Sequence, residues 1–251
     1  MENPPVASAE SNDRKEISVL IALGVIVIVC ICCLLAVAGY ALYSDISTSF
    51  LRERTPARDD APVQTGITFG EEFSSNRNDW SEGFFEDEYG TINYTVNGLY
   101  AWDVVATKGV SQKSWATAAP YVDDFTVTVE STHVGGAEDA SYGLLFRIAD
   151  IDNLYYFCIS DVGYYYAGLL QNGEWTTLID WTETSTINVN SLNTLKVVGE
   201  GDKFTFFVNG IMVDSVRDSS HPSGTAGLSI ELYNAGDESS FEFDNFVLSS
   251  P

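Results

Sequence analysis

Apolar and polar residues alternate in short runs from Gly66 to Pro251, and the runs "FTVTVE", "YGLLFRI" and "AGLSIEL" are examples. Such alternation predicts β-strands, because successive side chains of a strand point to opposite faces of a sheet. No window keeps a helical period for three turns. About a dozen short strands of this kind favour a two-sheet antiparallel jelly-roll sandwich over an open sheet, whose edges would stay exposed. We therefore predict an all-β domain over 66–251.

The segment "KFTFFVNGIMVDSV" gives the clearest hairpin signal. Phe204 and Phe206 are two residues apart and share one face of the first predicted strand. The dipeptide Asn209-Gly210 favours a type I′ turn, because both residues tolerate positive φ angles. The same signal recurs at Asn172-Gly173. We expect a hairpin at each place.

The N-terminal quarter follows a different pattern, since Ile17–Tyr43 carries no charged residue. A bilayer-spanning helix needs roughly 20 apolar residues, so this run predicts a transmembrane helix. A secretory signal peptide is the alternative, because Arg14-Lys15 precedes the run and Ala36-Val37-Ala38 has the form of a cleavage site. The apolar run is longer than a signal peptide needs, which favours an anchor that is not cleaved.

The predicted helix separates a short polar tail, 1–16, from a polar linker, 44–65, that contains Pro56 and Pro62. Basic residues lie on both sides of the helix, so the positive-inside rule does not settle the orientation. Our hypothesis places the tail in the cytoplasm and the domain outside the cell, because long domains cross a membrane largely regardless of their charge. The predicted location is the cell membrane, with a single pass.

Charge limits the partners of the chain. The sequence has 36 Asp and Glu residues against 12 Lys and Arg, a formal net charge of −24. Phosphate groups would be repelled, so we exclude nucleic acid as a partner. The same acidity offers many oxygen ligands for a hard cation such as Ca²⁺.

Several segments in order resemble a known family. They are "FGEEFSSNRNDW", "YTVNGLYAWDV", "YGLLFRIADIDNLYYFCIS", "YYYAGLLQNGEWTTLIDW", "NTLKVVGEGDKFTFFVNGIMVDSV", "GTAGLSIEL" and "FEFDNFVL". Together they are similar to the concanavalin A-like lectin and glucanase domains of bacterial surface proteins, also labelled LamG-like or 3-keto-disaccharide hydrolase-like. The resemblance implies a concanavalin A-like fold over the whole predicted domain. It implies less about function, because this fold serves lectins, glucanases and adhesion modules.

The glucanase signature of that family is incomplete in this sequence. Glucanases of this fold carry an E-x-D-x-(x)-E strand that points its carboxylates into one groove. Glu242 and Asp244 match the first two acids, but no third acid follows. The two histidines, His133 and His221, lie in polar stretches, and we expect them at the surface. Cys158 has apolar neighbours and is expected to be a small buried residue rather than a nucleophile.

Two sets of acids are candidate Ca²⁺ ligands. Asp150 and Asp152 lie two residues apart in the predicted turn of "RIADIDN", where their oxygens would share a cation or simply cap the backbone of the turn. The family resemblance implies a second site between the first and last strands, which would use Glu71 or Glu72 with Asp244. Structural calcium at either place is a prediction.

The stretch "SDVGYYYAGLLQNGEW" raises the question of a sugar-binding face. Alternation places Tyr164 and Tyr166 on one face of the predicted strand and Tyr165 on the other. Aromatic rings on both faces are expected of a central strand. Either the tyrosines are only packed, or one face opens into a groove where rings stack on the C–H faces of a sugar.

Trp175, Asp180 and Trp181 extend this candidate ligand-binding set, with Tyr164 and Tyr166. A tryptophan beside acidic groups at a strand end suits a sugar-binding edge, although each is also common at the rim of a core. We expect a membrane-anchored lectin-like module that binds a glycan or cell-surface component. A glycoside-processing hydrolase of the 3-keto-disaccharide type and a non-catalytic adhesion subunit with envelope protein partners are the alternatives.

Overall fold

The computed structural model describes residues 65–251, which form fifteen β-strands and contain no helix. Within this described range, therefore, no helix is long and apolar enough to cross a membrane. The predicted tail 1–16, the predicted transmembrane helix 17–43 and the linker up to residue 64 lie outside the described residues.

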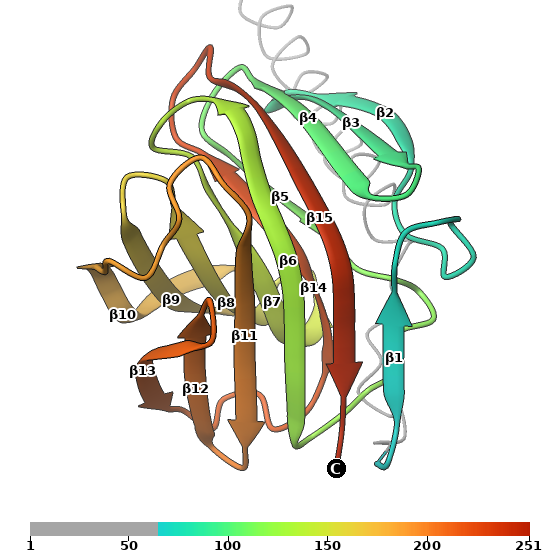
Figure 1. The fold of residues 1–251 in the computed structure, drawn as a ribbon, viewed down its shortest axis with the longest axis vertical. Helices are drawn as coiled ribbons and strands as arrows, with labels where there is room; N and C mark the ends of the chain where they lie inside the picture. Colours follow the sequence, from blue (N-terminus) through green and yellow to red (C-terminus); the bar gives the residue numbers. More distant parts are fainter. Residues whose placement is uncertain (1–64) are drawn as a thin grey trace, which may run out of the picture. The chain divides into compact units, whose positions relative to one another are not determined.

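The strands form two antiparallel sheets packed face to face (Figure 1). The larger sheet has nine strands, in the order β13 (Ile211–Arg217), β12 (Lys203–Val208), β11 (Asn193–Glu200), β6 (Phe125–Gly136), β15 (Glu238–Ser249), β4 (Tyr100–Ala106), β3 (Gly90–Val96) and β2 (Gly83–Asp87), with β1 (Thr68–Glu71) paired to the end of β15. The smaller sheet has six strands, in the order β10 (Glu174–Glu183), β9 (Tyr164–Gln171), β8 (Asn153–Ser160), β7 (Ser141–Asp150), β14 (Thr225–Leu232) and β5 (Val110–Ser114).

Both predicted hairpins are present. Asn209 and Gly210 have φ angles of 52° and 79°, and Asn172 and Gly173 have 53° and 78°. Positive φ at both central residues is the requirement of a type I′ turn, whose twist matches that of the strands it joins. These turns connect β12 to β13 and β9 to β10.

The core lies between the sheets and is rich in aromatic rings. Trp102 of β4 is fully buried and contacts Tyr94, Tyr100 and Phe243, with ring centroids 4.9 to 5.4 Å apart. Full burial of one large apolar side chain contributes about 1.5 to 3 kcal/mol to the stability of the fold. The predicted all-β sandwich is confirmed. The count of about a dozen strands was low, because short polar strands such as β5, "VSQKS", show no apolar alternation.

A buried arginine ties three loops to one end of the core. A β-bulge interrupts β7 at Arg147, whose φ angle of 46° is in the left-handed region. Its guanidinium donates hydrogen bonds to the backbone carbonyls of His221 (3.0 Å), Asp123 (2.8 Å) and Gly201 (2.6 Å). A buried charge needs such partners, since desolvation otherwise costs several kcal/mol. The bulge thus turns a strand residue into an anchor for the surrounding chain.

Candidate functional site: the outer face of the six-stranded sheet

Tyr164 and Tyr166 of β9 share one face, as alternation predicted, and this face points away from the core. Tyr165, between them, points inward, is 4% exposed and donates a hydrogen bond to the Asp214 carboxylate at 3.3 Å. Tyr164 is 36% exposed. Two of the three consecutive tyrosines are therefore on the outer face of this sheet, and the third is part of the core.

Tyr166 lies at the centre of an aromatic group on that face. Its ring centroid is 5.2 Å from that of Trp181, and its hydroxyl forms a 3.2 Å hydrogen bond with the Thr177 hydroxyl. The ring of Tyr156, from β8, lies 6.4 Å from Tyr166 and 6.1 Å from Trp175. Tyr156 is buried, so it packs against the more exposed rings and supports them. These contacts hold Tyr166, Trp175 and Trp181 in fixed positions.

The pairing of β10 with β9 has two irregularities between Trp175 and Thr182. The first lies between Thr177 and Ile179, so Leu178 and Ile179 both pack against the core. Uninterrupted alternation from Ile179 would then turn Trp181 inward as well. The second irregularity, between Ile179 and Thr182, returns Trp181 to the outer face, where it is 38% exposed. Bulges often re-aim a side chain beside a functional site.

Asp180 lies within the second irregularity of β10. Its side chain accepts a hydrogen bond from the backbone N–H of Trp181 at 2.8 Å, and its backbone carbonyl accepts one from the Thr182 hydroxyl at 2.7 Å. These local bonds fix the bulged backbone. In the structure Asp180 thus holds the backbone at Trp181, and its role in ligand binding stays a prediction.

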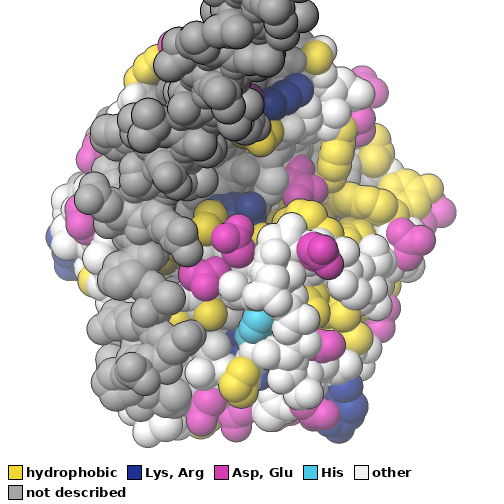
Figure 2. All heavy atoms as spheres, turned by 180° about the vertical axis from the view of Figure 1, so that it is seen from behind, with side chains coloured by type: hydrophobic (Ala, Val, Ile, Leu, Met, Phe, Trp, Pro, Cys, Tyr) yellow, Lys and Arg dark blue, Asp and Glu magenta, His cyan; other side chains and the backbone are white. Residues whose placement is uncertain are grey.

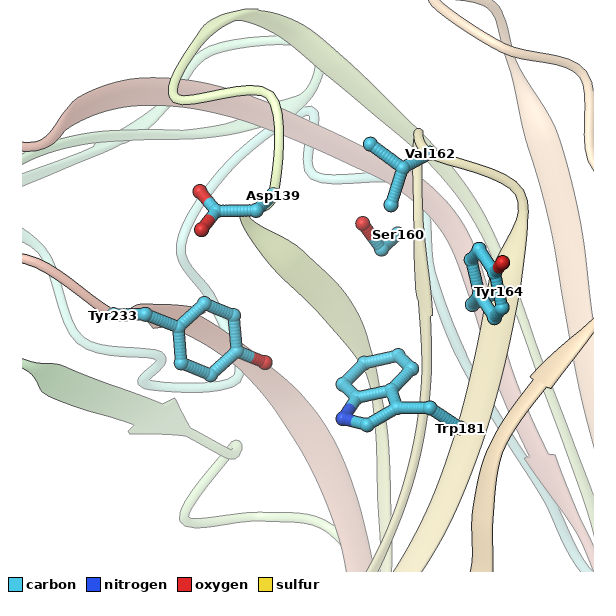
Figure 3. Close-up of a pocket in the computed structure, with 6 residues that line it drawn as sticks. All are labelled: Asp139, Ser160, Val162, Tyr164, Trp181 and Tyr233. Carbon is cyan, nitrogen blue, oxygen red and sulfur yellow. The ribbon is translucent and has the colours of Figure 1, made fainter.

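A shallow depression of about 370 Å³ opens beside Trp181. Figure 3 shows Tyr233 and Trp181 facing one another across it, with Asp139 near Tyr233 and with Val162 and Tyr164 on the far side. Its lining residues are Asp139, Ser160, Val162, Tyr164, Trp181 and Tyr233.

Sequence reasoning missed Asp139, Ser160, Val162 and Tyr233 as candidate site residues. Tyr233 directly follows β14, and Asp139 lies in the connection between β6 and β7. They reach the depression because β14 pairs with β7 and β7 with β8, and no local pattern encodes this strand order. One pattern in the sequence could have identified Tyr233. Alternation continues from Glu231 to Tyr233 and places both side chains on the outer face of the sheet.

Polar groups lie between the aromatic rings of this face. The Ser141 hydroxyl is 3.1 Å from the Tyr156 hydroxyl and 2.8 Å from that of Tyr233, which in turn donates to the Glu231 carboxylate at 3.2 Å. Burial raises the pKa of Glu231, and the Tyr233 hydrogen bond and the charge of Lys113 oppose that rise. The face thus combines apolar ring surfaces with hydroxyl and carboxyl groups, which is the combination that sugars require.

The candidate calcium ligands do not converge in the described part of the chain. Asp150 accepts hydrogen bonds from the Asp152 backbone N–H (2.8 Å) and from the Asn153 side chain (2.9 Å), so it caps its own turn. Among residues 65–251, no three His, Cys, Asp or Glu side chains are grouped so that they could hold a metal ion.

The second candidate calcium site, between the first and last strands, is built from acids with separate local partners. Glu71 is buried and accepts hydrogen bonds from the Phe73 N–H and from the Asn78 side chain. Glu72 is exposed at the end of β1, and Asp244 accepts a hydrogen bond from the N–H of the residue that follows it. Calcium at either site stays a prediction.

The acids that resemble the glucanase signature lie on the other sheet. Phe241 and Phe243 of β15 are fully buried, so Glu242, between them, and Asp244 face outward from the nine-stranded sheet. They therefore do not share a face with Tyr166. Cys158 is buried as predicted, and this burial raises its thiol pKa, which makes it a poor nucleophile.

The prediction that both histidines lie at the surface is wrong, since His133 is 4% and His221 8% exposed. His133 stacks on the Phe241 ring, and its Nδ1 is 3.3 Å from the Asp161 carboxylate. The Nε2 of His221 is 3.2 Å from the Leu170 carbonyl. Polar sequence neighbours were misleading here, because a buried partner allows a histidine to occupy an inward position.

The face opposite to that of Figure 1 is shown in Figure 2. Acidic side chains are scattered over the visible part among hydrophobic ones, and few basic side chains accompany them. On the outer face of the six-stranded sheet, the Lys113 ammonium lies 5.9 Å from the centroid of the Trp175 ring. Asp139 at the depression and the net charge of −24 disfavour an anionic ligand.

Comparison with known proteins identifies the architecture. No protein-family model and no curated protein matches the chain. Among solved structures, a glycosidic hydrolase in its native form aligns over 75% of this chain and 97% of its own, with 11% identity and a TM-score of 0.53. The β-glucanase of Bacillus licheniformis aligns over 75% of this chain and all of its own, with 12% identity and a TM-score of 0.50. The fold is a concanavalin A-like jelly roll.

A third solved structure, the carbohydrate-binding module CBM66 from Bacillus subtilis, is 20% identical and covers 75% of this chain and all of its own, with a TM-score of 0.48. The glycosidic hydrolase and the β-glucanase establish the jelly-roll fold, and at identities of 11% and 12% they establish no activity. The concanavalin A-like fold expected from the sequence motifs is thus confirmed, and the function has to be argued from the site.

Proposed function

We propose that this protein binds an uncharged glycan on the outer face of its six-stranded sheet. One observation carries the proposal: Trp181, whose ring centroid is 5.2 Å from that of Tyr166, lines a depression together with Tyr164 and Tyr233. Tyr164, Trp175 and Trp181 are 36%, 45% and 38% exposed and belong to one face, and grouped exposed rings of this kind commonly mark a ligand-binding surface. Stacking of a sugar on these rings would cover their exposed area.

The polar groups at the depression suit a sugar. Ring faces would contact the C–H faces of the sugar, and the Tyr233 hydroxyl, Asp139 and Ser160 would exchange hydrogen bonds with its hydroxyl groups. The net charge of −24 supports a neutral ligand over uronic acid or sulfated chains. The similar solved structures include a glycosidic hydrolase and a β-glucanase, which agree with this ligand class.

We further propose that residues 17–43 anchor the domain in the cell membrane and display it outside the cell, as the apolar sequence predicts. Protease added to intact cells should then remove the domain. Calcium remains part of the proposal through Asp150 and Asp152, or through Glu72 and Asp244. Excess EDTA should lower the melting temperature if either site is structural, and an unchanged melting temperature would remove both as stability elements.

The glycan proposal is tested with the full-length protein in a detergent that has no sugar head group, since such head groups would compete for the site. Fluorescence titration and calorimetry would use soluble glucans, xylans, fructans and polyuronates. We expect binding to at least one neutral polymer and weaker binding to the polyuronates. Trp181→Ala should lower the affinity about tenfold, which is a loss of about 1.4 kcal/mol. Phe84→Ala is the matched control, because Phe84 is 63% exposed on β2 of the other sheet.

The same titrations separate the alternatives. New reducing ends or altered sugars in the mixture would favour a hydrolase, and Glu231 would be the first acid to replace, because a raised carboxyl pKa suits a general acid. An unchanged affinity in Trp181→Ala would place the sugar elsewhere. Failure of every sugar to bind would favour an adhesion subunit with protein partners.

A further inference from the structure

Edge strand β10 presents two tryptophans on one face at two separate points. Trp175 pairs in register with Leu170 near the start of the strand, and Trp181 lies near its end. They are 45% and 38% exposed, and both contact aromatic rings of the outer face. A strand rises about 3.3 Å per residue, so these six positions separate the rings by at most roughly 20 Å.

The two irregularities of β10 preserve this arrangement, which six positions of uninterrupted alternation would also give. A single bulge after Thr177 would leave Trp175 outward and turn Trp181 inward, whereas the two irregularities together keep both outward. Bulges also discourage edge-to-edge pairing with another chain, so this edge is poorly suited to β-strand addition. Its exposed feature is the pair of indole rings, with Tyr166 between them in contact with Trp181.

The depression beside Trp181 does not extend to Trp175, which is absent from its lining. A single sugar ring in the depression would therefore leave Trp175 uncovered. A ligand that covers both indoles has to continue along β10, past Tyr166, for several sugar units. Near Trp175, the Lys113 ammonium at 5.9 Å provides a donor for hydroxyl groups at that end.

We infer that β10 binds an internal stretch of a linear, uncharged polysaccharide, with Trp175 and Trp181 as two stacking positions of one extended site. This inference rests on the proposed glycan binding and adds the length and shape of the ligand. The affinity of the protein for a linear oligosaccharide should therefore rise with the number of sugar units until both indoles are covered, and then stay constant. Each tryptophan contributes to binding of a long chain, whereas a short chain needs only one of them.

The test is a chain-length series on the full-length protein in the same detergent. Homologous β-1,3-gluco-, β-1,4-gluco-, xylo- and fructo-oligosaccharides of one to six units would be titrated by calorimetry. In the series that binds, we expect the hexasaccharide to bind at least tenfold more tightly than the disaccharide. Trp175→Ala should lower hexasaccharide affinity about tenfold and leave disaccharide affinity nearly unchanged, while Trp181→Ala should weaken both.

Trp175→Phe and Trp181→Phe keep a stacking ring and should recover most of the affinity, which separates stacking from a change of fold. Phe84→Ala should bind like the unaltered protein, and melting curves of all variants check folding. Equal affinity for disaccharide and hexasaccharide, or an unchanged hexasaccharide affinity in Trp175→Ala, would overturn the extended site and leave glycan binding intact. Absence of binding in all four series would count against both proposals.

Discussion

Tyrosines on the two faces of the six-stranded sheet differ in how their hydroxyl groups are bonded. On the core face, Tyr142, Tyr155 and Tyr165 each donate a hydrogen bond to an aspartate, at 2.8, 2.5 and 3.3 Å. On the outer face, Tyr166 bonds only to the hydroxyl of neighbouring Thr177. A buried hydroxyl must be paired, and a carboxylate is a strong acceptor. The core tyrosines are thus fixed by carboxylates, whereas Tyr164 and Tyr166 of the outer face keep part of their ring surface exposed.

The nine-stranded sheet gives the matching contrast. On β6, Thr126, Thr128 and Glu130 face outward between fully or nearly fully buried neighbours. This is the polar exterior expected of an antiparallel sheet that faces water. The outer face of β6 is thus polar, whereas the outer faces of β9 and β10 carry Tyr164, Tyr166, Trp175 and Trp181.

The largest expected difference between the two faces is in stability. Tyr165→Ala should lower the free energy of unfolding by about 3 to 4 kcal/mol, because it removes a buried ring from the core. Tyr164→Ala, one residue away on the outer face, should change it by less than about 1 kcal/mol. Urea unfolding of both variants measures the difference. Similar losses would mean that the outer ring is packed as tightly as the inner one, which contradicts the contrast.

A smaller difference is expected when only a hydroxyl group is removed. Tyr142→Phe leaves the buried Asp161 carboxylate without one of its donors, and should cost about 1 to 3 kcal/mol. Tyr166→Phe keeps the ring and loses a partly exposed bond, so it should cost less than about 0.5 kcal/mol and retain sugar binding. Unfolding midpoints and one sugar titration test both variants. A larger loss of unfolding free energy in Tyr166→Phe than in Tyr142→Phe would contradict the assignment of Tyr166 to the outer face and Tyr142 to the core.

The smallest effect depends on pH. Partial burial by itself raises the pKa of Asp218, but hydrogen bonds from the Tyr155 hydroxyl and from Ser220 outweigh it, and the net pKa is lowered. A lowered folded-state pKa stabilises the protein above the unfolded value of about 3.9, and this contribution disappears as pH falls through the folded value. Unfolding midpoints at pH 6 and pH 3 should therefore show Asp218→Asn less stable than the unaltered protein at pH 6 and nearly equal to it at pH 3. A stability difference between Asp218→Asn and the unaltered protein that is larger at pH 3 than at pH 6 would show that the fold does not favour the ionised form of Asp218.

Much of this organisation follows from alternation in the sequence. The period of two separates Tyr164 and Tyr166 from Tyr165, and the Asn-Gly dipeptides locate two hairpins, because both depend on neighbouring residues only. Alternation from Trp175 also gives Trp181 the outer face, but it does not contain the two bulges that turn Leu178 and Ile179 toward the core between them. Buried His133 is a similar case, since its acidic partner, Asp161, comes from a distant turn.

The grouping of the residues that line the depression could not be predicted from the sequence, because their proximity depends on the order of the strands in the sheet. Tyr233 and Asp139 meet Trp181 only because non-consecutive strands are neighbours in the six-stranded sheet. Short-range patterns determine which face a side chain occupies, and strand order determines which side chains share a site. The aromatic members of the site were therefore predictable, and its polar rim was not.

The most direct test of sugar binding on the outer face uses the five tryptophan side chains as internal reporters. Two-dimensional NMR of the indole N–H groups of the full-length protein, labelled with nitrogen-15, would be recorded with and without a bound neutral hexasaccharide. The signals of Trp175 and Trp181 should shift, and those of Trp80 and Trp102, buried in the core, should stay in place. Binding without any shift of Trp175 or Trp181 would contradict the account.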